Sequence, residues 1–192
     1  MCVLVSYKTT FFGEIYFQKY VFSMPMNSMY TKGAVFAKLK TELLEQGFTI
    51  EQEDMERPWG GFFVIDEGQA QAFANTYFEG LDVNDLKISG KLSPKILLVA
   101  PGTRLSWQYH HRRAEIWCLV GGTAGVCTSF TDTEGPLKAL SVGERLTLEQ
   151  GERHRLIGLD TWGVVAEIWQ HTDATQPSDE ADIVRVQDDF GR

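Results

Sequence analysis

The sequence predicts a mainly β protein with one or two short helices near its N-terminus. Three observations indicate this fold class. Helical periodicity is confined to residues 34–46 and 67–78. From Ser93 onward, short runs rich in β-branched and aromatic residues follow one another. Gly-containing turns separate these runs at intervals of about 8–12 residues, a spacing typical of an antiparallel sandwich or barrel.

The first predicted helix, residues 34–46, is amphipathic, and Gly47 can serve as its C-cap. The residues on its apolar face are Val35, Phe36, Leu39, Leu43 and Leu44. A second short helix is predicted to begin at Glu67 and to end by Gly80. Between the two helices, residues 62–65 are typical of a strand, because prolines and glycines punctuate the sequence before them.

A single domain is predicted for residues 31–192, since 192 residues suit one domain and no linker interrupts the chain. The preceding residues 1–30 form an N-terminal arm or extension with two possible interpretations. The segment is rich in aromatic residues and broken by charges, so it could add strands to another subunit. It could also be an artefact of an upstream start codon, since methionines at 24, 26 and 29 offer alternative starts.

The composition narrows the class of partner. Hydrophobic residues make up 43% of the chain, and the formal net charge is -8. An acidic surface argues against nucleic acids and anionic membranes as main partners, although a few local arginines can still bind a small anion. The three cysteines contain no CxxC pair, so a reducing cytoplasm is the simplest location.

Two separated segments carry side chains that suit a metal ion. Gln108 and His110 are two residues apart, so they point to one face of a strand, and Glu115 follows five residues later. The segment GERHRLIG supplies His154 from another strand. Two imidazoles, one carboxylate and one amide oxygen could hold a divalent cation inside a barrel.

These segments resemble the two short motifs of the cupin family. Gln108 occupies the position where many cupins have their first histidine, while His110, Glu115 and His154 match the remaining ligands. The resemblance implies the cupin double-stranded β-helix, a jelly-roll barrel. It also implies one divalent metal ion, with zinc as the first choice and manganese, cobalt, nickel or iron as alternatives.

More narrowly, the chain resembles the cupin domain of type II phosphomannose isomerases. That family also shows a glutamine at the first ligand position, histidines before Arg-Ala-Glu, and a His-Arg-Leu element. RPWGG at residues 57–61 and IVRVQDDFGR at the C-terminus resemble its flanking motifs, so the resemblance spans residues 54–192. It implies metal-dependent interconversion of mannose 6-phosphate and fructose 6-phosphate by a cytoplasmic enzyme.

The candidate catalytic residues are Arg155 and Glu167. Arg155 belongs to the family's His-Arg pair, although a regular strand would turn it away from His154. Glu167 lies on the last predicted barrel strand and could reach the cavity as a proton-transfer base. The candidates for binding a sugar phosphate through bidentate guanidinium contacts are Arg57, Arg113, Arg185 and Arg192.

Two departures from the family pattern leave alternatives open. Arg112 replaces a third consecutive histidine, and Phe190 replaces a tyrosine. These changes favour a non-catalytic cupin that binds a sugar or sugar phosphate. An iron cupin dioxygenase is a third hypothesis, which the glutamine at the first ligand position disfavours. In each case we expect a small-molecule ligand and a homodimer that protects exposed strand edges.

Overall fold

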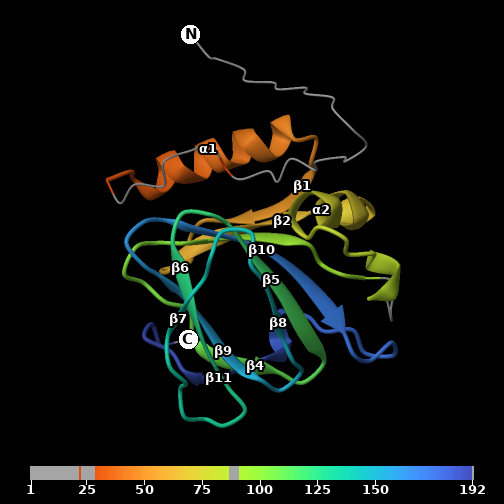
Figure 1. Cartoon of the computed structure of the whole chain (residues 1–192), viewed down its shortest axis with the longest axis vertical. Helices are drawn as coiled ribbons and strands as arrows, with labels where there is room; N and C mark the ends of the chain where they lie inside the picture. The colour runs from red at the N-terminus through yellow and green to blue at the C-terminus, as the bar shows by residue number, and fades with distance from the viewer. Residues whose placement is uncertain (1–21, 23–28, 87–90, 192) are drawn as a thin grey trace, which may run out of the picture.

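The computed structural model describes residues 22, 29–86 and 91–191, and it confirms the predicted mainly β fold (Figure 1). The strands form two antiparallel sheets, one of six strands and one of five. In spatial order, the first sheet contains β1 (Ile50–Asp54), β2 (Gly60–Ile65), β3 (Lys95–Val99), β10 (Gly163–His171), β5 (Arg113–Gly121) and β8 (Arg145–Leu148). The second contains β11 (Ile183–Gln187), β4 (Trp107–His110), β9 (Arg153–Gly158), β6 (Ala124–Ser129) and β7 (Lys138–Ala139).

The predicted first helix is present as α1 (Lys32–Glu45), which begins slightly earlier than its apolar pattern suggested. Thr31 explains the early start, because its hydroxyl accepts a hydrogen bond from the backbone N–H of Ala34. Gly47 follows the helix with φ of 86°, as the C-cap prediction required. Leu44 was wrongly assigned to the apolar face, since it is 53% exposed.

The predicted second helix is divided into two parts. A 3-10 turn, η1 (Glu67–Gln69), precedes the α-helix α2 (Ala70–Tyr77). Two further 3-10 turns are η2 (Val83–Asp85) and η3 (Glu180–Asp182). Asp66 caps the start of η1 by accepting a hydrogen bond from the N–H of Gly68.

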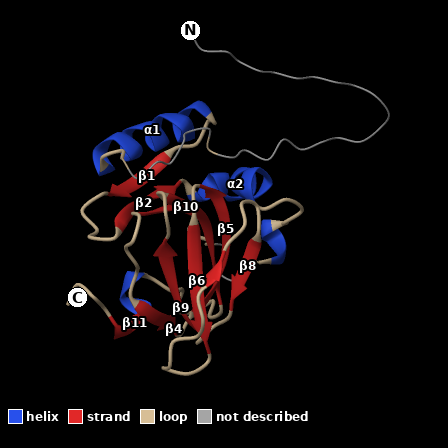
Figure 2. Ribbon diagram, turned by 60° about the vertical axis from the view of Figure 1, so that its left-hand side comes forward, coloured by secondary structure: helices blue, strands red, loops and turns tan. Residues whose placement is uncertain are grey.

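Both α-helices cover the outer face of the six-stranded sheet (Figures 1 and 2). Successive residues of a strand point to opposite faces, so Phe63 and Ile65 of β2 join the helix-facing core while Phe62 points to the other side. The helix-facing core also contains Leu39 of α1 and Phe73 of α2. This layer anchors the sheet from behind and leaves its inner face for the second sheet.

A second apolar cluster fills the space between the two sheets. Trp117 and Val165 reach it from the first sheet, and Val126 and Leu156 reach it from the second. Polar side chains of β3, β4, β5, β9 and β10 enter the same interior. The functional groups are therefore embedded in a packed double layer rather than placed on surface loops.

Most of the predicted N-terminal arm, residues 1–30, lies outside the described residues. Within it, Phe22 is buried, donates its backbone N–H to the carbonyl of Val120 and stacks on Tyr77. Among residues 22, 29–86 and 91–191, no helix is long and apolar enough to cross a membrane.

Replacing Phe73 with Ala should lower the free energy of unfolding by about 3–5 kcal/mol, because its ring is fully buried against Phe48, Tyr77 and Phe78. Urea denaturation would measure the change. Phe130, which is 63% exposed, provides the control, and its replacement by Ala should change stability little. Equal losses in the two variants would contradict the described core.

Candidate metal centre

Three potential metal ligands converge from both sheets. His110 of β4 and His154 of β9 come from the five-stranded sheet, and Glu115 of β5 comes from the six-stranded sheet. One ligand atom from each residue lies within 4.8 Å of the others, and each residue is only 2% exposed. The predicted metal site therefore has a compact geometric basis, although its motifs lie far apart in the sequence.

The histidine rings are oriented by contacts on their far sides. Nδ1 of His154 lies 3.0 Å from the carbonyl oxygen of Glu152, and Nδ1 of His110 lies 3.3 Å from that of Asp182. Since a carbonyl only accepts hydrogen bonds, these contacts favour a proton on Nδ1 and leave Nε2 as a ligand atom. The two Nε2 atoms lie 3.1 and 3.3 Å from the oxygens of Glu115.

Two of these buried atoms have no hydrogen bond. Oε2 of Glu115 and Nε2 of His154 face each other without a donor between them. Burying two acceptors in this way is costly unless a cation satisfies both. Two imidazoles and a carboxylate also form a donor set that divalent transition metals accept. The residues present therefore fit a bound divalent metal ion.

Electrostatics favour the protonation states that a metal needs. Burial lowers the pKa of His110, which keeps its imidazole neutral. Burial alone would raise the pKa of Glu115, but neighbouring His110 and Arg113 hold it well below its usual value. Neutral imidazole and ionised carboxylate are the forms that coordinate metal.

The predicted fourth ligand, Gln108, lines the cavity beside this triad. It lies two residues before His110 on β4 and is paired with His154 on β9. Its side-chain oxygen accepts a hydrogen bond of 2.6 Å from the hydroxyl of Ser106. This contact fixes the amide, while direct ligation by Gln108 stays a prediction.

Arg113 lines the cavity, and its predicted role as a phosphate ligand stays a prediction, because contacts within the protein already occupy its donors. Its Nε donates to Oε1 of Glu115 at 2.7 Å, and its Nη1 donates to the hydroxyl of Ser178 at 2.8 Å. The guanidinium lies 3.6 Å from the ring centroid of Trp169 and is almost completely buried. Arg113 is therefore committed to orienting Glu115, which leaves little of its donor capacity for a substrate.

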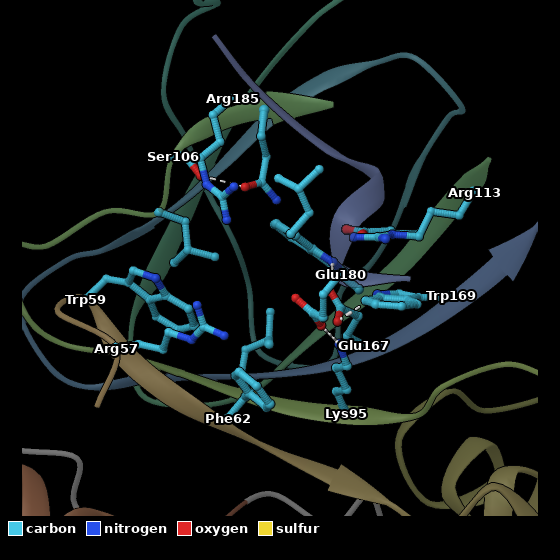
Figure 3. Close-up of a pocket in the computed structure, with 16 residues that line it drawn as sticks. Arg57, Trp59, Phe62, Lys95, Ser106, Arg113, Glu167, Trp169, Glu180 and Arg185 are labelled. Atoms are coloured by element: carbon cyan, nitrogen blue, oxygen red, sulfur yellow. Dashed lines mark hydrogen bonds and ion pairs between the residues drawn. The ribbon is translucent and has the colours of Figure 1, made fainter. Parts of the chain in front are cut away.

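The predicted base Glu167 lines the same cavity as Glu115 (Figure 3). Its two carboxylate oxygens accept hydrogen bonds of 3.0 Å from the indole N–H groups of Trp117 and Trp169. Burial, reinforced by the negative charge of Glu115, raises the pKa of Glu167 to about 7, although Lys95 and Arg113 oppose the shift. A buried carboxyl of this kind can exchange a proton near neutral pH.

The other predicted site residues have different locations. Arg57 and Arg185 line the cavity, and Arg57 also pairs with Asp54 at 2.8 Å. Arg192 lies outside the described residues.

Arg155 does not join the site, because alternation along β9 points it away from His154, toward Glu134 and the carbonyl of Gln187. Its predicted catalytic role therefore has no support in this geometry.

The sequence reasoning missed Lys95, its partner Glu180, and Asp182. Lys95 lines the cavity and pairs with Glu180 at 2.6 Å. A lysine at the start of the otherwise apolar KILLV strand was an available signal. The carboxylate of Asp182 accepts hydrogen bonds from the backbone N–H groups of His111 and Arg112 and from the hydroxyl of Ser178, and no sequence spacing indicated this contact.

Comparison with known proteins gives a consistent result. Residues 70–188 match a family model described as mannose-6-phosphate isomerase C-terminal. The chain is 30% identical over 144 residues to mannose-1-phosphate guanylyltransferase ManC of Salmonella typhimurium, covering 72% of this chain and 23% of that protein. It is 37% identical over 84 residues to alginate biosynthesis protein AlgA of Pseudomonas putida, covering 43% of this chain and 13% of AlgA. The match thus spans less than a quarter of either relative.

Among solved structures, the chain is similar to oxalate decarboxylase from Bacillus subtilis, with 15% sequence identity and a TM-score of 0.49. That similarity covers 70% of this chain and 29% of the decarboxylase chain.

Replacing Asp182 with Ala should weaken metal binding by about 10–100-fold, because its carboxylate fixes the backbone that follows His110. Competition with a chromogenic chelator would measure the affinity for zinc. Glu144→Gln is the control, since Glu144 pairs with Lys138 and neither residue contacts the triad. Unchanged zinc affinity in the Asp182 variant would contradict its orienting role.

Proposed function

The chain belongs to the family described as mannose-6-phosphate isomerase C-terminal, as its motifs predicted, and we propose that it is a metal-dependent aldose-ketose isomerase. Its proposed reaction interconverts mannose 6-phosphate and fructose 6-phosphate. The observation that carries this proposal is that Glu115 of the candidate metal triad and Glu167, whose pKa is raised to about 7 by burial, line one cavity.

The reaction needs a group that moves a proton between two neighbouring carbons of the open-chain sugar. Glu167 takes the proton from C2 of the aldose and returns it to C1, while the hydroxyl proton passes from O2 to O1. His110, Glu115 and His154 would hold a divalent metal, which would serve as a Lewis acid for the carbonyl oxygen of the substrate.

The surroundings of Glu167 support its role as the base. Trp117 and Trp169 donate to opposite oxygens of the carboxylate and prevent its rotation. Each oxygen keeps a second lone pair that can accept the substrate proton. The two indole rings also exclude water around the carboxylate, and this burial raises its pKa to about 7, so that it can accept the substrate proton near neutral pH.

Cations in the cavity support a phosphorylated substrate. Arg57 and Arg185 line the cavity, where four cationic side chains face three glutamates although the chain as a whole has a net charge of -8. Guanidinium groups match the spacing of phosphate oxygens. The phosphate would fix one end of the sugar and leave the carbonyl end for Glu167.

The two departures that favoured a non-catalytic cupin lie outside the cavity lining. Arg112 pairs with Asp179 and Asp182, where it ties a loop to the domain. Phe190 is 38% exposed near the C-terminus. Neither change removes a group that the proposed chemistry uses.

The full chain loaded with zinc, manganese or cobalt should convert mannose 6-phosphate to fructose 6-phosphate in a coupled assay. His110→Ala combined with His154→Ala should abolish turnover, because both imidazole ligands are lost. Glu144→Gln should retain it. Stoichiometric metal without turnover of this substrate would instead favour a sugar-binding module.

Turnover should also depend on the protonation of Glu167. The value of kcat/KM should rise with pH through about 7, because only the deprotonated carboxylate accepts a proton. Glu167→Gln should lower kcat by about 10²–10⁴-fold while metal content stays unchanged. A Gln variant with full activity and the same pH profile would remove Glu167 from the mechanism.

A further inference from the structure

Three positively charged side chains of the cavity act on one carboxylate, that of Glu180. Nζ of Lys95 lies 2.6 Å from its Oε1. Burial alone would raise the pKa of Glu180, but the charges of Lys95, Arg113 and Arg57 lower it. The Glu180 carboxylate therefore occupies a point in the cavity where the protein stabilises negative charge.

The cations at this point are held in place by aromatic rings. The Lys95 ammonium lies 3.6 Å from the ring centroid of Trp169 and 5.3 Å from that of Phe62, and its side chain is only 7% exposed. The Arg57 guanidinium lies 5.4 Å from the same Phe62 ring. Figure 3 shows Phe62 between the two cations. Cation–π contacts thus fix both charges before any ligand binds.

The Glu180 side chain, in contrast, can move away from Lys95 without a change in the backbone. Its side chain is 54% exposed on the short turn η3. The residues around it are anchored separately, since Ser178 contacts Arg113 and the Asp182 carboxylate holds the backbone of Arg112. Because about half of the Glu180 side chain is exposed, water screens the pair from that side, and an external anion can compete with Glu180 when this side chain rotates outward.

The position of this carboxylate suits the phosphate end of a substrate. Glu115 and Glu167 are 2% and 5% exposed and form the deep part of the cavity, whereas half-exposed Glu180 lies at its mouth. A sugar phosphate with its carbonyl near Glu167 would therefore place its phosphate toward Glu180. A phosphate also offers more charge and more acceptor oxygens than a carboxylate.

We propose that Lys95 and Arg57 form the phosphate subsite of the cavity, and that Glu180 occupies this subsite until the substrate phosphate displaces it. The identity of the substrate rests on the proposed function, while the anion subsite itself does not. Lys95, which the sequence reasoning missed, is then a specificity residue for phosphorylated over neutral sugars.

The subsite is tested by calorimetric titration of the full chain with inorganic phosphate and with mannose 6-phosphate. A chelator first removes any bound metal, so that no metal ion can bind the anion. Glu180→Gln should tighten binding of both by about 5–10-fold, since the internal competitor is removed. Lys95→Met should weaken it by about tenfold or more, and Lys95→Arg should retain most of it. Neutral mannose should respond to none of these changes.

Asp179→Asn is the matched control, because it removes the same charge from the same segment while Asn can still cap η3. If Asp179→Asn and Glu180→Gln tightened phosphate binding equally, the change in net charge alone would explain the effect, and the proposal would be overturned. Lys95→Met with unchanged phosphate affinity and an intact thermal transition would overturn it as well.

The two proposals fail in distinguishable ways. Phosphate binding that depends on Lys95 and Glu180, without isomerase turnover, would refute the proposed reaction and support the subsite. If the protein turns over mannose 6-phosphate but its phosphate affinity does not change when Lys95 or Glu180 is replaced, only the subsite is refuted.

Discussion

Strand β10 runs through the middle of the six-stranded sheet and has no face toward solvent. Val164, Ala166 and Ile168 pack toward the helices, so the alternate residues, among them Glu167 and Trp169, must enter the space between the sheets. A carboxyl group buried in this way is costly unless its oxygens find donors, and two indole N–H groups provide them. The packing of the helices behind the sheet thus determines which groups reach the cavity.

The same cavity holds two buried carboxyl groups with opposite tendencies. Glu115 lies against Arg113 and two imidazoles, which favour its ionised form. Glu167 lies between indole rings, where burial raises its pKa to about 7. Two titratable groups whose environments separate their pKa values can take different roles, one as a ligand and one as a base. This division of roles connects the proposed metal chemistry to the proposed proton transfer.

The segment before β11 links the C-terminal part of the chain to the metal triad. The carbonyl of Asp182 lies 3.3 Å from Nδ1 of His110, its carboxylate holds the backbone of Arg112, and Ser178 contacts Arg113. Glu180 on the same segment pairs with Lys95 at the cavity mouth. The orientation of the candidate ligands and the proposed anion subsite therefore depend on one short stretch whose sequence carries no metal-ligand spacing.

The sequence by itself determined the fold class, the family and the three candidate ligands His110, Glu115 and His154, because strand periodicity and short motifs are local signals that can be recognised without a structure. It also reached Glu167 through strand parity. Only the tertiary structure decided which of the alternating residues of each strand face the space between the sheets. Arg155 therefore points away from the site, and Lys95 points into it. It also committed Arg113 to Glu115 rather than to an open phosphate site. These outcomes depend on contacts between residues distant in sequence, such as Lys95 with Glu180, for which no local pattern exists.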